Sequence, residues 1–269
     1  MHSKRPKYTA RTADPHLLYQ ISVQAPENDV HFLNRVYKNT YGRRPLSLRE
    51  DFCGTALLCR EWVGSHRKRT AVGVDLDEEV LAWGRRHNAE PLGSDAHRIE
   101  LRKADVRKVN DLETEIIVAF NFSYWIFTER QEMVRYLKAA RRSLQKEGLF
   151  VCDILGGPDA QCTLEERKTM PGFKYVWEQE SFNPIDHLMR CAIHFEFPDG
   201  SRMRKAFTYS WRLWSAAEMK DCLAEAGFSR SEVYWEGTCR ETMEGNGIFT
   251  RRPKVENEQA WVSYIVAFP

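Results

Sequence analysis

Apolar positions along the chain change their spacing in a regular order. Between residues 46 and 155, short apolar runs of strand length alternate with segments whose apolar residues recur every three or four positions, the period of a helix that faces a core. Strands joined by such helices form parallel crossover units, so the pattern predicts an α/β fold with a doubly wound, mostly parallel sheet. The strands are predicted at 46–50, 71–75, 99–105, 116–121 and 149–155, and the helices at 57–62, 78–88 and 130–148.

The alternation of strands and helices stops at Gly156. Three strand-like runs then follow one another without helices, and the stretch Pro198-Asp-Gly-Ser201 between the last two is typical of a hairpin turn. Residues 156–211 are therefore predicted to form an antiparallel β insertion after the fifth strand. The three runs cover 173–182, 187–197 and 204–211.

The flanking segments complete the predicted domain. Before the first strand, Asn28 or Asp29 is predicted to cap a helix that ends at Gly42. After the insertion, two further strands at 232–235 and 261–268 bring the predicted Rossmann-like sheet to seven strands. We expect an N-terminal segment, residues 1–29, followed by one domain, residues 30–269, that carries the insertion.

Composition narrows the functional classes. The 269 residues carry a formal net charge of +2, so the chain has no general attraction for nucleic acids or membranes. No apolar stretch approaches the roughly 18 residues of a transmembrane helix, and the N-terminus lacks the apolar centre of a secretory signal. The seven cysteines form no CxxC pair and the eight histidines no HxxxH pair, so neither disulfides nor a metal site are expected. We expect a soluble, cytoplasmic protein.

Polar residues mark the ends of the predicted parallel strands. Glu50 precedes a turn in which Gly54 lets the backbone approach a ligand, and Asp75, Asp105 and Asn121 end the next three strands. Such strand ends share one edge of a sheet, where open α/β sheets bind ligands, so these residues are predicted to line one crevice. The turn lacks the GxGxxG pattern of nicotinamide-binding folds, and carboxylates repel phosphates but attract cations. The sequence therefore favours a nucleoside ligand without phosphates.

The segments around these residues resemble the motifs of the class I S-adenosylmethionine-dependent methyltransferases. The first segment departs from the family pattern, because Phe52 and Ala56 stand where glycines are usual. The resemblance implies methyl transfer from S-adenosylmethionine, with S-adenosylhomocysteine as the product. It is carried by Leu48-Arg-Glu-Asp-Phe-Cys-Gly-Thr-Ala56, Val72-Gly-Val-Asp-Leu76, Ala104-Asp-Val-Arg107 and Ala119 to Ser123, and later by Glu147-Gly-Leu-Phe-Val151 and Glu225-Ala-Gly-Phe228.

The same resemblance implies a cofactor site along this edge of the sheet. The residues of this site would contact the methionyl amine, the ribose, the adenine and the sulfonium of the cofactor, and a residue of the N-terminal segment would act as a lid. Position by position, these are Glu50 and Gly54 at the amine, Asp75 at the ribose hydroxyls, Leu76, Asp105 and Val106 at the adenine, Asn121 and Phe122 beneath the sulfonium, the Phe52 ring near the ligand, and Tyr19 as the lid.

Methyl transfer from a sulfonium requires only that the protein hold the nucleophile in line with the methyl group and exclude water. A base is needed only for an acceptor that arrives protonated, and the candidates for catalytic roles are Tyr124 and His194, with His187 as a further base. Asn121 and Tyr124 occupy the places of the first and last residues of the Asn-Pro-Pro-Tyr motif of amino-group methyltransferases. Both prolines are absent, so this pattern favours a nitrogen acceptor only weakly. The residues predicted to bind the acceptor are Tyr209, Trp211 and Arg212.

Three other functions remain open on the sequence alone. The same fold could act on RNA or protein, which only the basic N-terminus and Arg43-Arg44 support. The chain could instead be a nucleoside-binding scaffold without turnover, or, as the weakest alternative, a nicotinamide oxidoreductase. A small-molecule acceptor is preferred, without a nucleic-acid or membrane partner, and the oligomeric state is left open.

Overall fold

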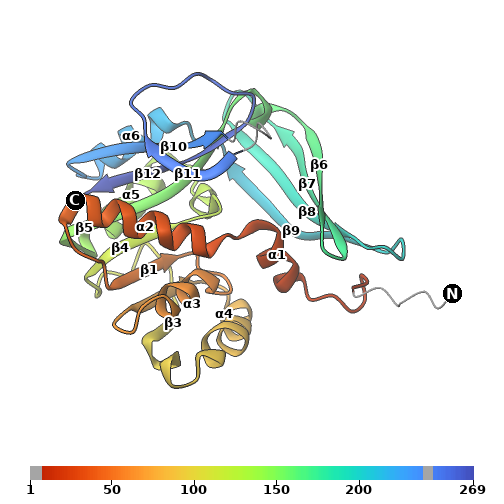
Figure 1. The fold of residues 1–269 in the computed structure, drawn as a ribbon. Helices are drawn as coiled ribbons and strands as arrows, with labels where there is room; N and C mark the ends of the chain where they lie inside the picture. Colours follow the sequence, from red (N-terminus) through yellow and green to blue (C-terminus); the bar gives the residue numbers. More distant parts are fainter. Residues whose placement is uncertain (1–7, 239–244) are drawn as a thin grey trace. The chain divides into compact units, whose positions relative to one another are not determined.

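The computed structural model describes residues 8–238 and 245–269. These residues form two compact units. The insert unit comprises the residues up to 24 together with 157–213, and the larger sheet unit comprises 25–156 together with 214–269 (Figure 1).

Within the described residues, the sheet unit is built on an eight-stranded sheet of order β11-β10-β12-β5-β4-β1-β2-β3. The five strands from β5 to β3 are parallel, whereas β12, β10 and β11 run antiparallel to their neighbours. This confirms the predicted α/β, mostly parallel, Rossmann-like sheet. The bounds are β1 Ser47–Asp51, β2 Thr70–Asp75, β3 Ile99–Lys103, β4 Thr114–Ala119, β5 Leu144–Gly156, β10 Arg230–Thr238, β11 Gly245–Arg251 and β12 Trp261–Phe268.

The eighth strand, β11, is absent from the seven-strand prediction. It lies at the edge of the sheet beside β10, and its residues are mostly exposed, so its sequence shows no apolar alternation. Phe249 is the half-buried exception, and its ring lies 4.5 Å from that of Tyr264. An edge strand held by one apolar contact leaves little trace in a hydrophobic pattern.

Helices cover both faces of this sheet (Figure 1). Apolar residues of α2 and α3 share one core with Leu48, Ile116 and Val151 from the central strands. On the opposite face, α5 packs beside β5 and α6 beside β10. The bounds are α2 Pro26–Tyr41, α3 Leu57–Gly64, α4 Glu78–Gly84, the π turn η1 Arg85–Ala89, the 3-10 segments η2 Glu90–Arg98 and η3 Ser123–Ile126, α5 Arg130–Arg142 and α6 Ala216–Glu225.

Two helix boundaries differ from the prediction. Helix α2 begins at Pro26, a residue favoured in the first helical turn, so neither Asn28 nor Asp29 caps it and Asp29 lies inside the helix. Helix α5 ends at Arg142 instead of reaching 148, because β5 already starts at Leu144. In both cases the local spacing of apolar residues was correct but extended across the boundary.

Among the described residues, the insert unit contains helix α1 and a four-stranded antiparallel sheet of order β6-β7-β8-β9. Leu18 of α1 packs in a core with Phe173, Ile193 and Phe195. Three of the strands were predicted; β6 was missed because its residues are mostly charged and exposed. The bounds are α1 Pro15–Val23, the 3-10 segment η4 Pro158–Gln161, β6 Leu164–Met170, β7 Phe173–Phe182, β8 Leu188–Glu196 and β9 Arg202–Arg212. In the ranges that the structure describes, no helix is both long and apolar enough to cross a membrane.

Helix α4 approaches the turn after β1 closely at Gly84. A Cβ atom at this position would lie 2.5 Å from the carbonyl oxygen of Thr55, a separation that real Cβ atoms essentially never show. The neighbouring Asn88 side chain donates to the same oxygen at 2.7 Å, so the backbone of the turn is held in place. Gly84 is therefore required by close packing of the helix on the turn.

We predict that Gly84→Ala lowers the free energy of unfolding by about 1–3 kcal/mol, the usual cost of forcing extra atoms into a packed site. Gly64→Ala is the matched control, because a Cβ there meets nothing within 4 Å and its backbone is not left-handed. The control is expected to be neutral or slightly stabilising. Urea denaturation of both variants checks this; equal stabilities would contradict it.

Candidate active site

The turn after β1 has an unusual backbone. Phe52, Gly54 and Ala56 have φ values of 57°, 51° and 56°, in the left-handed region that favours glycine. The two non-glycine residues are therefore strained, which matches their departure from the family pattern. The Phe52 ring, predicted near the ligand, packs 5.8 Å from the Phe127 ring and 5.7 Å from the Tyr136 ring.

Asp75, at the end of β2, fixes this turn from the neighbouring strand. Its Oδ2 accepts the backbone N–H of Gly54 at 2.8 Å, and its Oδ1 accepts that of Asp77 at 3.0 Å. Leu76 follows directly and exposes 62% of its surface, an uncommon state for a leucine beside a buried strand. Asp75 and Leu76, predicted at the ribose and the adenine, thus lie together, and the side chain of Leu76 leaves an apolar surface exposed.

Asp105, just after β3, is held by Arg107. The guanidinium donates from Nε to Oδ1 at 3.0 Å and from Nη2 to Oδ2 at 2.7 Å, and it also pairs with Glu132 of α5. Hydrogen bonding by this guanidinium lowers the pKa of the Asp105 carboxyl, so the carboxylate is ionised at neutral pH. Val106, predicted beside the adenine, is buried next to this pair.

Arg49, in the middle of β1, is completely buried. Its Nε donates to Asp51 Oδ1 at 2.7 Å, while its Nη2 and Nη1 donate to the carbonyl oxygens of Val106 and Val109, each at 3.0 Å. The Tyr136 hydroxyl donates to the other Asp51 oxygen at 2.9 Å. One buried ion pair therefore connects β1, the loop that carries Asp105, and helix α5.

The turn after β4 contains a second pair of left-handed residues, Asn121 and Phe122, with φ values of 57° and 55°. Their backbone N–H groups donate to the two carboxylate oxygens of Asp153, at 2.6 and 3.0 Å. The completely buried Tyr124 donates its hydroxyl to the Asp153 carbonyl at 2.7 Å. Burial raises the pKa of Tyr124 well above its ordinary value, so this geometry argues against the predicted catalytic role and favours a role in holding the turn.

Three carboxyl groups, those of the buried Glu50 and Asp153 and of the half-buried Asp29, face the same part of the sheet unit. Burial raises the pKa of Glu50 to about 8, of Asp153 to about 7 and of Asp29 to about 6. The negative charge of Asp29 raises the pKa values of Glu50 and Asp153 further. Hydrogen bonds to the carboxyl groups act in the opposite direction and lower their pKa values. The Cys59 N–H donates to Glu50 at 3.2 Å, and the Tyr264 hydroxyl donates to Asp29. In the described part of the chain, none of the three carboxyls forms an ion pair with lysine or arginine. A cation bound here would offset this unfavourable burial of acids.

The insert unit places the predicted acceptor residues on two different faces of its sheet. Cys191 of β8 pairs with Tyr209 of β9, and these two side chains share one face. Trp211, two residues beyond Tyr209, lies on that face, whereas Arg212 lies on the other. His194, three residues after Cys191, also points away from Tyr209. The predicted group of acceptor residues is therefore divided.

The prediction of His194 as a base is not supported by its contacts. Its Nδ1 accepts the backbone N–H of Lys205 at 2.9 Å, which leaves the proton on Nε2. Nε2 lies 2.8 Å from Glu178 Oε2 and donates to it. Both ring nitrogens are occupied, and the ring faces away from Tyr209, so His194 is a structural residue of the strand pair.

Aromatic rings gather on the face of the insert unit that carries Tyr209. Its ring stacks on Trp211 at 4.2 Å, and Trp177 lies 6.1 Å away. Tyr19 of α1 packs its ring 5.0 Å from Phe207, and its hydroxyl is hydrogen-bonded to Tyr209. Burial, followed by the neighbouring Tyr19, raises the pKa of Tyr209 well above its ordinary value. The predicted lid residue and two predicted acceptor residues thus share one surface.

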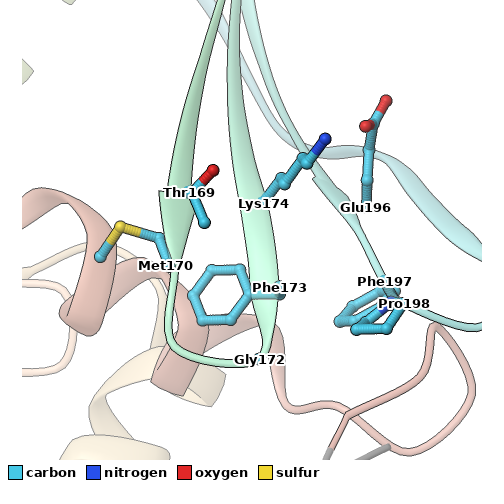
Figure 2. A pocket seen from close by; sticks show the side chains of 8 residues that line it. All are labelled: Thr169, Met170, Gly172, Phe173, Lys174, Glu196, Phe197 and Pro198. Atoms are coloured by element: carbon cyan, nitrogen blue, oxygen red, sulfur yellow. The ribbon is translucent and has the colours of Figure 1, made fainter.

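The insert unit also contains a cavity of about 440 Å³ between the ends of its strands (Figure 2). Lys174 and Glu196, which pair across β7 and β8, extend to the same side of it. None of the predicted site residues lines it; the lining residues are Thr169, Met170, Gly172, Phe173, Lys174, Glu196, Phe197 and Pro198. Outside residues 1–7 and 239–244, no group of three or more His, Cys, Asp or Glu side chains is arranged to hold a metal ion.

Comparison with known proteins agrees with this geometry. Residues 52–148, which include the turns after β1 and β4 and both strand-terminal aspartates, match the family model of a methyltransferase domain. Over this part of its length, the chain resembles a methyltransferase domain. No protein in a search of curated sequences matches this chain.

Several solved structures share the fold of this chain over 94–100% of its length. An S-adenosylmethionine-dependent methyltransferase from Clostridium acetobutylicum is 17% identical, with a TM-score of 0.66 and coverage of 94% of this chain and 96% of that one. The amino pentose methyltransferase CalS10 from Micromonospora echinaspora is 12% identical, with a TM-score of 0.66 and full coverage of both chains. The sugar N-methyltransferase KedS8 from Streptoalloteichus is 16% identical, with a TM-score of 0.62 and coverage of 100% and 96%. At these identities the comparison shows the fold alone.

Sequence reasoning found the strand-end acids but missed the residues that hold them. Arg49 and Asp51 stand two residues apart, on one face of a buried strand, which is a readable signal of a buried ion pair. Arg107 stands two residues after Asp105, where a bidentate pair is sterically easy. Asp29 and Asp153 carry no comparable signal, because only the tertiary fold brings them together.

We predict that Arg49→Met lowers the free energy of unfolding by about 3–5 kcal/mol, because it leaves the Asp51 carboxylate buried without a counter-charge. The double variant Arg49→Met with Asp51→Asn removes that charge and keeps an acceptor for Tyr136. It is expected to be more stable than the single variant in urea denaturation. A double variant that loses the sum of both single effects would contradict the assignment.

A second prediction concerns pH. Glu50 has a folded-state pKa of about 8, above its value in an unfolded chain, so the folded state binds the proton more tightly and ligand-free stability falls as pH rises from about 4.5 to 8. Glu50→Gln removes this dependence. The stability of the wild type relative to the variant should decline by up to about 1.4 kcal/mol per pH unit across this range. Parallel stability curves in urea at pH 5, 6.5 and 8 would argue against it.

Proposed function

We propose that this methyltransferase transfers the methyl group of S-adenosylmethionine to an amino group of a small-molecule acceptor. The observation that carries the proposal is a set of three carboxyl groups, the buried Glu50 and Asp153 and the half-buried Asp29, that have no cationic partner among the described residues. A ligand with an ammonium and a sulfonium group, or an acceptor that arrives as an ammonium ion, would supply the missing positive charge.

The residues of the sheet unit fit the cofactor. When bound, S-adenosylmethionine supplies a methyl group already activated by its positive sulfur. Asp75 retains carboxylate lone pairs for the ribose hydroxyls, and the exposed Leu76 offers an apolar surface to the adenine. The ionised Asp105 accepts a hydrogen bond from the adenine amino group, beside Val106. Glu50 and Gly54 face the methionyl amine, and Asn121 and Phe122 form the floor beneath the sulfonium.

An amine acceptor requires a group that takes its proton before nucleophilic attack. A base is most effective when its pKa lies near the working pH, and the carboxyls of Asp29 and Asp153, with pKa values of about 6 and 7, meet this condition. Tyr124 and His194 do not, for the geometric reasons given above. We assign proton acceptance to these acids.

The acceptor itself is assigned to the aromatic face of the insert unit. The half-buried Tyr209 lies there with its ring stacked on the buried Trp211, and Tyr19 lies beside it. Aromatic faces bind sugars, planar groups and organic cations. CalS10 is described as an amino pentose methyltransferase, KedS8 as a sugar N-methyltransferase and MtfA as a glycopeptide N-methyltransferase, which supports an amine on a small or glycosylated molecule.

We predict that Asp75→Ala weakens S-adenosylmethionine binding by about 1–3 kcal/mol, the usual loss for a charged hydrogen-bond acceptor. Asp111→Ala is the matched control: it removes the same charge from an exposed loop, where Asp111 pairs with Arg102. The control should bind as the wild type does. Isothermal titration calorimetry measures both; equal affinities for the two variants would remove the ribose assignment.

The same variants test turnover. A panel of aminosugars, each paired with the corresponding hydroxyl sugar, is incubated with the enzyme and S-adenosylmethionine, and release of S-adenosylhomocysteine is measured. Release is expected with members of the amine set, reduced in Asp75→Ala and retained in Asp111→Ala. Release only with hydroxyl sugars would overturn the nitrogen assignment, and a wild type that takes up no S-adenosylmethionine would overturn the function itself.

A further inference from the structure

We propose that Asp153 is a positioning residue of the transfer reaction, whose side chain holds the Asn121–Phe122 backbone in the conformation that forms the floor beneath the sulfonium. This inference rests on the proposed function and adds a requirement that no strand-end motif contains. The positioning role of Asp153 is separate from proton acceptance by the same carboxyl group, because positioning depends on the two contacts to the backbone.

The contacts use both oxygens of one carboxyl group. Asp153 Oδ2 accepts the N–H of Asn121 at 2.6 Å and Oδ1 accepts that of Phe122 at 3.0 Å, so two successive amides are bound by one side chain. Both residues are left-handed, a conformation that costs energy for any residue with a Cβ. Without a partner for both amides, the turn would relax towards an ordinary backbone conformation and leave buried N–H groups unpaired.

The position of Asp153 in the sheet makes this restraint rigid. Its neighbour Cys152 on β5 pairs in parallel register with Ala119, the last residue of β4, so the side chain of Asp153 reaches the turn from the buried stretch of an adjacent strand. On its other side it pairs with Tyr264 of β12. The Tyr124 hydroxyl, bound to the Asp153 carbonyl at 2.7 Å, ties the far end of the turn to the same residue.

Asp153→Asn tests the restraint with almost no change in volume. An asparagine offers one carbonyl oxygen, so one of the two amides loses its acceptor and faces an NH₂ group. Ser263→Ala is the matched control. Ser263 is equally buried on the adjacent strand β12, and its hydroxyl has no hydrogen-bond partner among the described residues.

Two measurements are made on the full-length protein. Amide hydrogen exchange by NMR should show at least a tenfold loss of protection at Asn121 or Phe122 in Asp153→Asn, with no change at Ile117 and Val118 in the centre of β4. Calorimetry with S-adenosylmethionine and S-adenosylhomocysteine should show at least a tenfold weaker affinity for the sulfonium compound. The affinity for the neutral thioether should change less than threefold. Ser263→Ala should alter neither measurement.

The possible results of these measurements distinguish failure of this inference from failure of the proposed function. Unchanged exchange at both turn amides, or equal losses of affinity for the two compounds in step with a lower melting temperature, would show that Asp153 is merely structural and overturn this inference while the proposed function stands. A wild type that binds neither compound would overturn the proposed function and this inference together. Loss of protection with a selective loss of S-adenosylmethionine affinity supports both.

Discussion

The buried ion pair between Arg49 and Asp51 is the constraint on which the cofactor edge of the sheet depends. A guanidinium taken out of water must find partners for its donors, and here these are Asp51 and the carbonyls of Val106 and Val109. Because those carbonyls belong to the loop after β3, satisfying the arginine also fixes the backbone beside Asp105. The Tyr136 hydroxyl extends the network into α5. A charge inside β1 thereby holds the loop that follows a strand two places away in the sheet.

On the other face of β1, the acidic side chains have no positively charged partner among the residues that the structure describes. There Glu50 lies buried with Asp29 nearby, and the carboxyls of both carry raised pKa values because burial disfavours their charged forms. Stability alone would replace such acids with apolar residues, and under the proposed function a bound cation offsets the cost of keeping them. The two faces of one strand thus differ: one holds an ion pair, and the other holds acids for which the described residues supply no counter-charge.

How much the sequence could predict depended on burial. The parallel strands and their terminal acids were readable because β4, for example, is buried at all six positions and its neighbours alternate with helices. The edge strands β6 and β11 were not, since most of their residues face water. The candidate site residues followed the same rule: Asp75 could be proposed from its strand end, whereas the contacts that argue against His194 as a base depend on pairing with β7 and β9. Asp153 could not be found, because its partners lie 31 and 32 residues away and bind it through backbone groups.

The turn after β4 shows how one physical restraint can replace another. In the Asn-Pro-Pro-Tyr pattern of amino-group methyltransferases, two proline rings would limit the backbone by covalent geometry. Here Phe122 and Ser123 stand in their places, and a proline at 122 could not adopt the observed φ of 55°. Of the two amide N–H groups that prolines would lack, at 122 and 123, Asp153 binds that of Phe122, and it also binds that of Asn121. The restraint has moved from the turn's own residues to a carboxylate on the neighbouring strand. Matching the sequence pattern therefore matters less than whether some group in the fold fixes the same stretch of backbone.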